Sequence, residues 1–193
     1  MPRICVFTGS SDGRRPAYTD AATRLGRALV AQGYELVYGG ARVGLMGAVA
    51  DAVLGAGGRV IGVIPQALVE REVAHTGLSE LRVVASMHER KALMAELSDG
   101  FIAMPGGWGT LEELFEVITW HQLGLHRKPI GLLNVDGYYD ALLAFLRQAH
   151  DDGFVRGDRE RLLPVAAAPE ALLALLASVE LPARRAWIDR ASS

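Results

Sequence analysis

Short runs of consecutive apolar residues alternate along the chain with longer stretches of helical periodicity. The apolar runs are residues 3–8, 34–40, 59–64, 81–85, 100–105 and 129–134, and the helical stretches are 17–32, 44–54, 87–97, 111–123 and 138–151. Strands that are apolar on successive residues are buried on both faces, which is typical of a parallel sheet between two layers of helices. With right-handed crossovers, the pattern predicts a doubly wound α/β fold, a Rossmann-like three-layer sandwich.

The length of 193 residues fits one domain with a proper core. A closed (β/α)₈ barrel typically needs about 250 residues, so it is disfavoured. The alternation weakens after residue 154, where we expect a turn, a short extended piece and a helix that begins after Pro169. We therefore predict a single nucleotide-binding domain over residues 1–180 and a C-terminal tail over 181–193.

The overall charge is close to neutral, with a formal net charge of −2 and 22% charged residues. This balance favours neither disorder nor a nucleic-acid surface. No apolar run approaches the ~20 residues that cross a bilayer, and the N-terminal run is too short for a secretory signal. The one cysteine, Cys5, lies in an apolar strand, which is typical of the core of a reduced, cytoplasmic protein. We expect a small molecule or a second copy of the chain as partner, and no nucleic acid or membrane.

Ligands of open parallel sheets bind outside the carboxyl ends of the strands. Three loops that follow predicted strands are rich in glycine or hydroxyl residues, namely 8–13 (TGSSDG), 38–47 (YGGARVGLMG) and 105–110 (PGGWGT). None has the G-x-G-x-x-G pattern of a dinucleotide fold or the G-x-x-x-x-G-K-[ST] pattern of a P-loop. Together at one edge of a sheet, they favour a nucleotide or a sugar phosphate.

The PGGWGT loop has a composition suited to anion binding. Glycines let the backbone approach an anion closely, and free N–H groups at the start of the following helix bind phosphate with the help of the helix dipole. The alternative is a tight strand-to-helix turn whose glycines only provide positive φ angles. For this loop alone, both interpretations stay open.

Residues Thr110 to Glu113 fit a Thr-x-x-Glu capping box, which would explain Glu113 as a partner of the Thr110 backbone. A carboxylate in the first turn of a helix is stabilised as the anion, so we expect a low pKa for Glu113. It would then be a poor general acid but a good base. It could equally stabilise a developing cation, such as the anomeric carbon of a sugar.

The stretch SMHERKALMAEL supplies a basic partner. Ser86 and Glu89 fit a second capping box that places a helix start near Met87, and the apolar stripe of this helix continues backwards onto Arg90. Either Arg90 is a surface cation whose stem covers apolar residues, or its guanidinium points into the crevice and holds an acid or a phosphate.

Other common chemistries have little support in the sequence. His88 and His121 are each separated from further metal-ligand residues, so we expect no metal site. A Ser-His-Asp hydrolase is disfavoured because the G-x-S-x-G elbow is absent. We expect no cofactor.

The stretches PGGWGTLEE, MHERK and YGGARVGLMG together resemble the LONELY GUY (LOG) family of cytokinin riboside 5′-monophosphate phosphoribohydrolases, which are often mislabelled lysine decarboxylases. The similarity extends from CVFTGSS to about residue 165. It implies hydrolysis of the N-glycosidic bond of an adenine-type nucleoside 5′-monophosphate, or AMP itself, to free base and ribose 5-phosphate. It also implies a dimer, for which the segment VITWHQLGLH (residues 117–126) offers apolar surface.

By position, the resemblance implies that Arg90 and Glu113 are the essential catalytic pair. The substrate-binding positions that it implies, or that the glycine loops predict, are Gly9, Ser10, Gly39, Gly40, Glu72, Lys91, Gly106, Gly107, Trp108, Gly109, Thr110, Leu111, Glu112 and Thr119. In the resulting hypothesis, the N–H groups of residues 107–110 hold the 5′-phosphate. Glu113 stabilises the ribosyl cation and orients water, and Arg90 anchors Glu113 or substrate oxygens.

Two other functions compete with this hypothesis. A non-catalytic nucleotide or molybdenum-cofactor carrier would use the glycine loops without needing an Arg90–Glu113 pair. A pyridoxal-phosphate decarboxylase would need Lys91 as its Schiff-base lysine.

Overall fold

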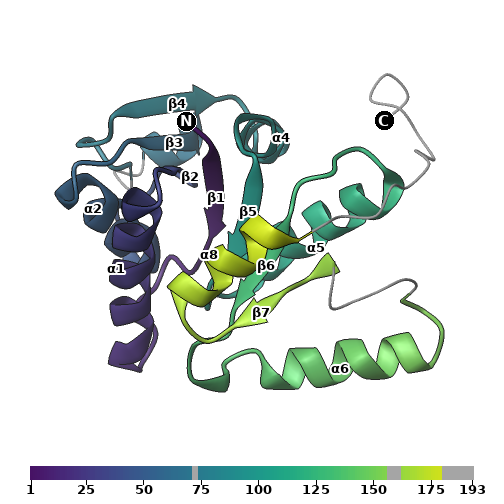
Figure 1. Cartoon of the computed structure of the whole chain (residues 1–193). Coiled ribbons are helices and arrows are strands. Elements are labelled where there is room, and N and C mark those ends of the chain that lie inside the picture. Colours follow the sequence, from purple (N-terminus) through teal and green to yellow (C-terminus); the bar gives the residue numbers. More distant parts are fainter. Residues whose placement is uncertain (71–73, 156–161, 180–193) are drawn as a thin grey trace.

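The computed structural model describes residues 1–70, 74–155 and 162–179, and these residues contain one seven-stranded parallel sheet (Figure 1). Its strands are β1 (Arg3–Phe7), β2 (Glu35–Tyr38), β3 (Val60–Pro65), β4 (Glu80–Val84), β5 (Gly100–Ala103), β6 (Ile130–Leu133) and β7 (Val165–Ala166). The strand order is β4-β3-β2-β1-β5-β6-β7. The predicted doubly wound topology is therefore confirmed.

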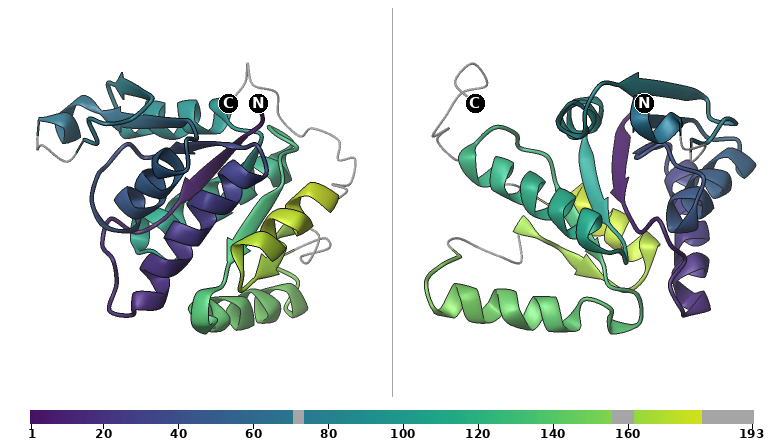
Figure 2. Two further views of the ribbon diagram at one scale, coloured as in Figure 1. Left: turned by 60° about the vertical axis from the view of Figure 1, so that its left-hand side comes forward. Right: turned by 180° about the vertical axis from the view of Figure 1, so that it is seen from behind.

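Helices cover both faces of this sheet (Figures 1 and 2). One layer consists of α1 (Pro16–Ala31), α2 (Gly44–Gly55) and α8 (Pro169–Ser178), and the other consists of α4 (Met87–Leu97), α5 (Trp108–Leu123) and α6 (Asp140–Asp151). Two short elements, α3 (Gln66–Val69) and the 3₁₀ helix η1 (Val135–Gly137), lie in connections.

The core is divided between the two faces of the sheet. Along β1, Ile4 and Val6 pack toward α1, α2 and α8, whereas Cys5 and Phe7 pack toward the opposite layer. Both sets are buried, because successive side chains of a strand point to opposite faces. This explains the apolar runs of the inner strands, whereas β4 at the edge of the sheet is buried only at Val84.

The helix boundaries differ from the predictions by more than one residue at two places. α5 begins at Trp108, three residues before the predicted start at residue 111. α6 begins at Asp140 rather than at 138, because η1 precedes it and the Asn134 side chain accepts a hydrogen bond from the backbone N–H of Tyr139. The helix predicted after Pro169 is present as α8.

The strand order reverses at β1. The chain runs outward from β1 through β2 and β3 to β4, and β5 then pairs with β1 on its other side. The loops after β1 and β5 therefore diverge at a topological switch point, which is where open α/β sheets bind ligands. These loops are residues 8–13 and 105–107, and they form the centre of the candidate site.

The predicted division into a domain of residues 1–180 and a tail of 181–193 stays a prediction, because residues 180–193 lie outside the described part of the chain. Within the described ranges, none of the helices combines the length and the apolar composition that a bilayer crossing requires.

Candidate active site

The three glycine-rich loops predicted to share an edge of the sheet are brought together. The backbone N–H of Gly9 donates to the carbonyl of Pro105 at 3.1 Å, and the Thr8 hydroxyl donates to the same carbonyl at 3.2 Å. The backbone N–H of Met46, in α2, donates to the carbonyl of Gly9 at 3.3 Å. The loop after β1 thus links the other two.

In the turn at residues 105–109, Gly106 is required for space, and none of the glycines is required for a positive φ. Neither Gly106, Gly107 nor Gly109 has a positive φ, so the turn interpretation based on left-handed glycines is wrong here. A Cβ atom on Gly106 would collide with the Thr110 hydroxyl and would lie 2.9 Å from the Gly9 nitrogen. A Cβ on Gly107 or Gly109 would meet nothing within 4 Å, so this side of the turn is open.

Gly107 is the N-cap residue of α5, and no side chain caps this helix. The Thr110–Glu113 capping box is therefore not formed, because α5 begins two residues before Thr110. The first N–H groups of an α-helix have no intrahelical acceptor, and the helix dipole adds positive potential there. The turn thus offers open backbone amides to an anion.

Arg90 and Glu113 form a buried ion pair. The Arg90 Nη1 atom donates to Glu113 Oε1 at 3.0 Å, and Arg90 Nε donates to the Val63 carbonyl at 3.1 Å. Both residues are only 8% exposed. Arg90 therefore points into the protein, as one of the two predicted alternatives required, and it holds the carboxylate that it faces.

The position of Arg90 follows from the start of α4. Ser86 is the N-cap residue, and its hydroxyl accepts a hydrogen bond from the Glu89 N–H at 3.1 Å. The Glu89 carboxylate accepts in turn from the N–H of Ala85 at 2.8 Å. The predicted helix start at Met87 is thus confirmed, and it directs Arg90 toward the sheet.

The prediction of a low pKa for Glu113 is wrong. Because α5 begins at Trp108, Glu113 lies in the second turn of the helix, beyond the N-terminal amides. Burial is the strongest influence and raises the pKa of Glu113, whereas the charge of Arg90 lowers it and that of Glu112 raises it. The net direction is upward, so Glu113 binds a proton more readily than an exposed glutamate.

The second glycine loop forms the wall behind Arg90. A side chain at Gly39 would collide with the Arg90 guanidinium, so only glycine fits there. Gly40 has a φ of 76°, and its carbonyl accepts a hydrogen bond from the backbone N–H of His75 at 2.9 Å. Both predicted positions are therefore buried, and Gly39 leaves the space that the guanidinium of the pair occupies.

Lys91 does not join Arg90 at the pair. Its ammonium group contacts the Glu112 carboxylate and lies 3.0 Å from Glu116 Oε1, so it ties α4 to α5. Desolvation alone would lower the pKa of Lys91, but the hydrogen bonds to Glu112 and Glu116 outweigh it and raise the pKa. Lys91 and Glu112 therefore neutralise each other in this structure.

The remaining predicted positions differ in how close they lie to the glycine turn. Ser10 lies beside the glycine turn, and Trp108 is 90% exposed at the start of α5. Leu111 is half-buried on the same helix and packs against the core of that layer. Thr119 is exposed and donates to the Phe115 carbonyl, about 15 Å along the axis from Gly109. Glu72 lies outside the described residues.

Tyr138 is a site residue that sequence reasoning missed. Its hydroxyl donates to the Gly106 carbonyl at 2.6 Å, and its ring lines a cavity of about 270 Å³ together with Gly9, Ser10 and Gly107. The available signal was its position after the apolar run 129–134. The carboxyl end of that run, β6, lies next to β5 in the sheet, so its loop reaches the same edge.

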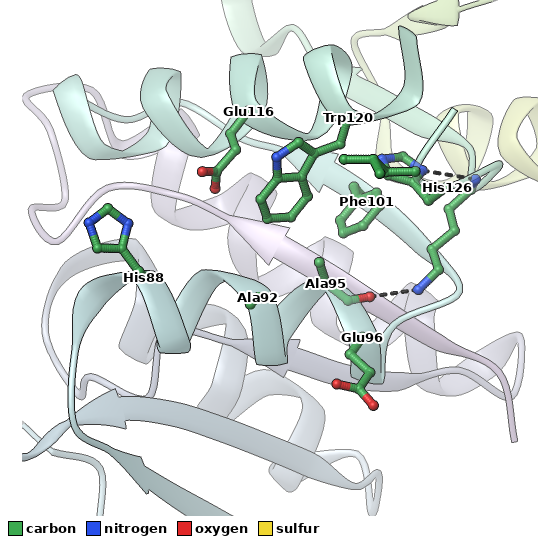
Figure 3. A pocket seen from close by; sticks show the side chains of 10 residues that line it. His88, Ala92, Ala95, Glu96, Phe101, Glu116, Trp120 and His126 are labelled. Carbon is green, nitrogen blue, oxygen red and sulfur yellow. Dashed lines mark hydrogen bonds between the residues drawn. The ribbon is translucent and has the colours of Figure 1, made fainter. Parts of the chain in front are cut away.

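A second, larger cavity lies between α4 and α5 (Figure 3). Its volume is about 480 Å³, and Ala92, Phe101 and Trp120 are among its apolar lining residues. Trp120 and His126 belong to the segment VITWHQLGLH, for which apolar surface was predicted. This α4–α5 groove is distinct from the cavity at the glycine turn.

Cys5 is buried in β1, as predicted. Burial, followed by the negative charge of Glu113, raises the pKa of its thiol. A thiol in this state is a poor nucleophile. Among the described residues, no three His, Cys, Asp or Glu side chains are grouped so that they could hold a metal ion.

The fold and the site together define a doubly wound α/β protein with an amide-rich turn at its switch point and a buried Arg–Glu pair nearby. The family model described as "Possible lysine decarboxylase" matches residues 46–176. The chain belongs to this family, which includes the LOG proteins.

Curated plant proteins of the family are similar over most of the chain. A rice (Oryza sativa subsp. japonica) protein named probable cytokinin riboside 5′-monophosphate phosphoribohydrolase LOGL9 is 58% identical over 169 residues, which is 88% of this chain and 74% of the relative. Rice LOG is 56% identical over 83% of this chain and 66% of its own length. Arabidopsis thaliana LOG7 is 56% identical over 83% of this chain and 74% of its own length.

Solved structures with the same fold are more distant in sequence. The molybdenum cofactor binding protein from Rippkaea orientalis has a TM-score of 0.70 and 25% identity, with 92% of this chain and 96% of that chain covered. The molybdenum cofactor carrier protein from Chlamydomonas reinhardtii has a TM-score of 0.68 at 24% identity, with 92% and 99% covered. The second likeness concerns the fold alone.

Proposed function

We propose that the protein hydrolyses the N-glycosidic bond of a cytokinin riboside 5′-monophosphate or of AMP. The bond between the anomeric carbon and the base nitrogen breaks, and its electron pair leaves with the base. A water molecule supplies the hydroxyl group that bonds to the anomeric carbon. The remaining proton of that water ends on the base. The products are the free base and ribose 5-phosphate.

The observation that carries this proposal is the buried Arg90–Glu113 pair next to the open amides of the glycine turn. Gly109 and Glu113 are four residues apart on α5, so they lie on the same face and about 6 Å apart along the axis. One ligand can therefore place a phosphate at the amides and a sugar carbon at the carboxylate. This arrangement suits a nucleoside 5′-monophosphate.

Glu113 provides negative charge for the cationic transition state of glycoside cleavage. Its ionised form is the useful one, because it both stabilises the ribosyl cation and orients the attacking water. Arg90 uses its Nε and Nη1 atoms on Val63 and Glu113, so its role is to orient the carboxylate and to favour its charged form. Losing one such electrostatic contribution typically costs ~10²–10³-fold in rate.

The relatives support hydrolysis over transport. The phosphoribohydrolases named above are 56–58% identical to this chain, whereas the cofactor-binding proteins are 24–25% identical. A carrier also has no need for a buried acid. The decarboxylase alternative requires a lysine that loses its proton, and the raised pKa of Lys91 between two carboxylates opposes this.

The proposal is tested by incubating the protein with AMP and, separately, with the 5′-monophosphate of N6-isopentenyladenosine, and by measuring free base and ribose 5-phosphate by liquid chromatography. We expect base release from one or both. Glu113→Gln should lower kcat by ~10²–10³-fold. Glu170→Gln, a change on the exposed face of α8, serves as the matched control. Normal base release by Glu113→Gln would contradict the assignment.

The same assay addresses substrate preference. A hydrophobic pocket gains only ~1–3 kcal/mol from each additional methylene group, so the ratio of kcat/KM for the two nucleotides is the relevant quantity. We further propose that the protein acts as a homodimer in a reducing, cytoplasmic compartment. The apolar α4–α5 groove and the buried free Cys5 support these two points.

A further inference from the structure

Tyr138 contacts the glycine turn through a single, well-placed hydrogen bond. Its hydroxyl donates to the Gly106 carbonyl at 2.6 Å. The ring is held by edge-to-face contacts with Tyr18, at 5.5 Å between centroids, and with Tyr139, at 4.8 Å. Tyr138 therefore has one defined orientation, although its side chain is partly exposed.

The Gly106 carbonyl belongs to the same peptide unit as the Gly107 N–H. A peptide unit is planar, and in its trans form the carbonyl and the N–H point in opposite directions. The described residues contain no cis peptide bond. A bond that fixes the Gly106 carbonyl toward Tyr138 therefore fixes the Gly107 N–H in the opposite direction.

This constraint matters because the unit lies between two glycines. Glycine populates many φ and ψ values, so a Gly–Gly peptide plane can rotate at little cost unless something holds it. Gly107 is also the N-cap residue of α5, and both it and Tyr138 line the cavity at the turn. Rotation of this plane would turn the Gly106 carbonyl oxygen, which repels an anion, to the side where the Gly107 N–H now lies.

We infer that Tyr138 is a positioning residue for phosphate binding: it orients the Gly106–Gly107 peptide so that the Gly107 N–H is available to the 5′-phosphate. The inference rests on the proposed function. The Tyr138 hydroxyl has one proton, and the Gly106 carbonyl accepts it, so the hydroxyl does not donate to the anion as well. Its effect on the ligand is transmitted through the peptide plane.

The chain offers a matched control in the next residue. Tyr139 also donates to a backbone carbonyl at 2.6 Å, but its acceptor is Met104, two residues before Gly106. Tyr139 is 2% exposed, so removal of its hydroxyl leaves a buried carbonyl without this donor. Tyr138→Phe and Tyr139→Phe thus remove equivalent bonds, and only the first bond involves the peptide that carries the Gly107 N–H.

The test measures the binding of ribose 5-phosphate, inorganic phosphate and adenosine to the two variants by titration calorimetry, which needs no turnover. Tyr138→Phe should raise the Kd for ribose 5-phosphate and for phosphate about tenfold and leave the Kd for adenosine within about twofold. Tyr139→Phe should lower Tm while leaving all three Kd values within about twofold. In turnover, Tyr138→Phe should raise KM for the nucleotide and leave kcat nearly unchanged.

Three results would overturn the inference. They are an unchanged phosphate Kd in Tyr138→Phe, an equal loss of phosphate and adenosine binding in that variant, or an equal loss of phosphate binding in both variants. Failure of the proposed hydrolysis appears separately, as a wild-type protein that binds ribose 5-phosphate but releases no base.

Discussion

The carboxylate of Glu113 experiences two opposing influences. Removal from water disfavours its charge, and the adjacent Arg90 guanidinium, 3.0 Å away, favours it. A buried carboxylate that lost this partner would have to bind a proton or bear an uncompensated charge, which is strongly unfavourable. The ion pair therefore keeps an anion where the proposed reaction develops positive charge.

This balance predicts an unusual pH dependence. Because the pKa of Glu113 is raised, its anion is lost at a higher pH than that of an exposed glutamate as the solution is acidified. The acid limb of kcat/KM, which reports the free enzyme, should therefore lie above the ~4.3 of an ordinary glutamate. Rate measurements from pH 4 to pH 8 test this expectation; a limb at or below the ordinary value contradicts it.

Removal of the arginine should move this limb further. The charge of Arg90 lowers the pKa of Glu113, so Arg90→Ala should shift the acid limb to higher pH and reduce kcat/KM at every pH. Arg24→Ala, on the exposed face of α1, is the control and should leave the profile unchanged. An Arg90→Ala profile that coincides with that of the wild type would show that the two groups are not coupled in solution.

At the residue scale, the sequence identified both members of the pair but not their environment. Arg90 was identified because it continues the apolar stripe of α4, but the stripe left open whether its guanidinium lies at the surface or in the crevice. The pKa of Glu113 was not predictable, because it depends on where α5 begins. A shift of three residues in that start moves Glu113 from the first helical turn, where amides stabilise the anion, to a buried second turn.

At the scale of the elements, the glycines at the junction between β5 and α5 differ in the space available for a side chain. A Cβ at Gly106 would collide with Thr110, whereas one at Gly109 would enter open space. Gly106→Ala should therefore lower the free energy of unfolding by about 1–3 kcal/mol. Gly109→Ala should raise it by about 0.4–1 kcal/mol, because the unfolded chain loses conformational freedom.

Urea unfolding of the two variants and the wild type measures these differences. Both changes add one methyl group, at Gly106 in the loop before α5 and at Gly109 in its first turn, and the space around the two glycines differs. Equal destabilisation by both changes would indicate that the turn needs glycine for its backbone angles, contrary to the φ values of this structure.

The strands and most helices were predictable because each has a strong local signal. β1, β2, β3, β5 and β6 are buried throughout apart from the first residue of β1, and each is an apolar run apart from Arg3 and Glu35 at the starts of β1 and β2. The 3₁₀ helix η1 was missed because it depends on an uncommon local geometry, with Asp136 at a φ of 48° and the Asn134 side chain hydrogen-bonded to residues 139 and 140. The role of Tyr138 was missed because it depends on a tertiary contact, since its acceptor is 32 residues away.

At the scale of the whole molecule, the α4–α5 groove leads to a prediction about assembly. We expect the wild-type protein to sediment at micromolar concentration as a dimer of the 20.7 kDa chain. Trp120→Glu places a charge among the apolar groove residues and should shift the protein to monomer. Phe145→Glu, at a 63% exposed position on α6 outside the groove, should remain dimeric. A monomeric wild type would disprove the assembly.

The central position of β1 has a consequence for biosynthesis. Ile4 pairs with Leu36 on one side and with Gly100 on the other, so β1 has both of its neighbouring strands only after β5 has been synthesised. The ribosome must synthesise the chain well beyond Gly100 before the loops after β1 and β5 can form the candidate site. Until then β1 is an unpaired edge strand of the nascent protein. Such an edge is a target for chaperones, and the nucleotide site is not yet formed.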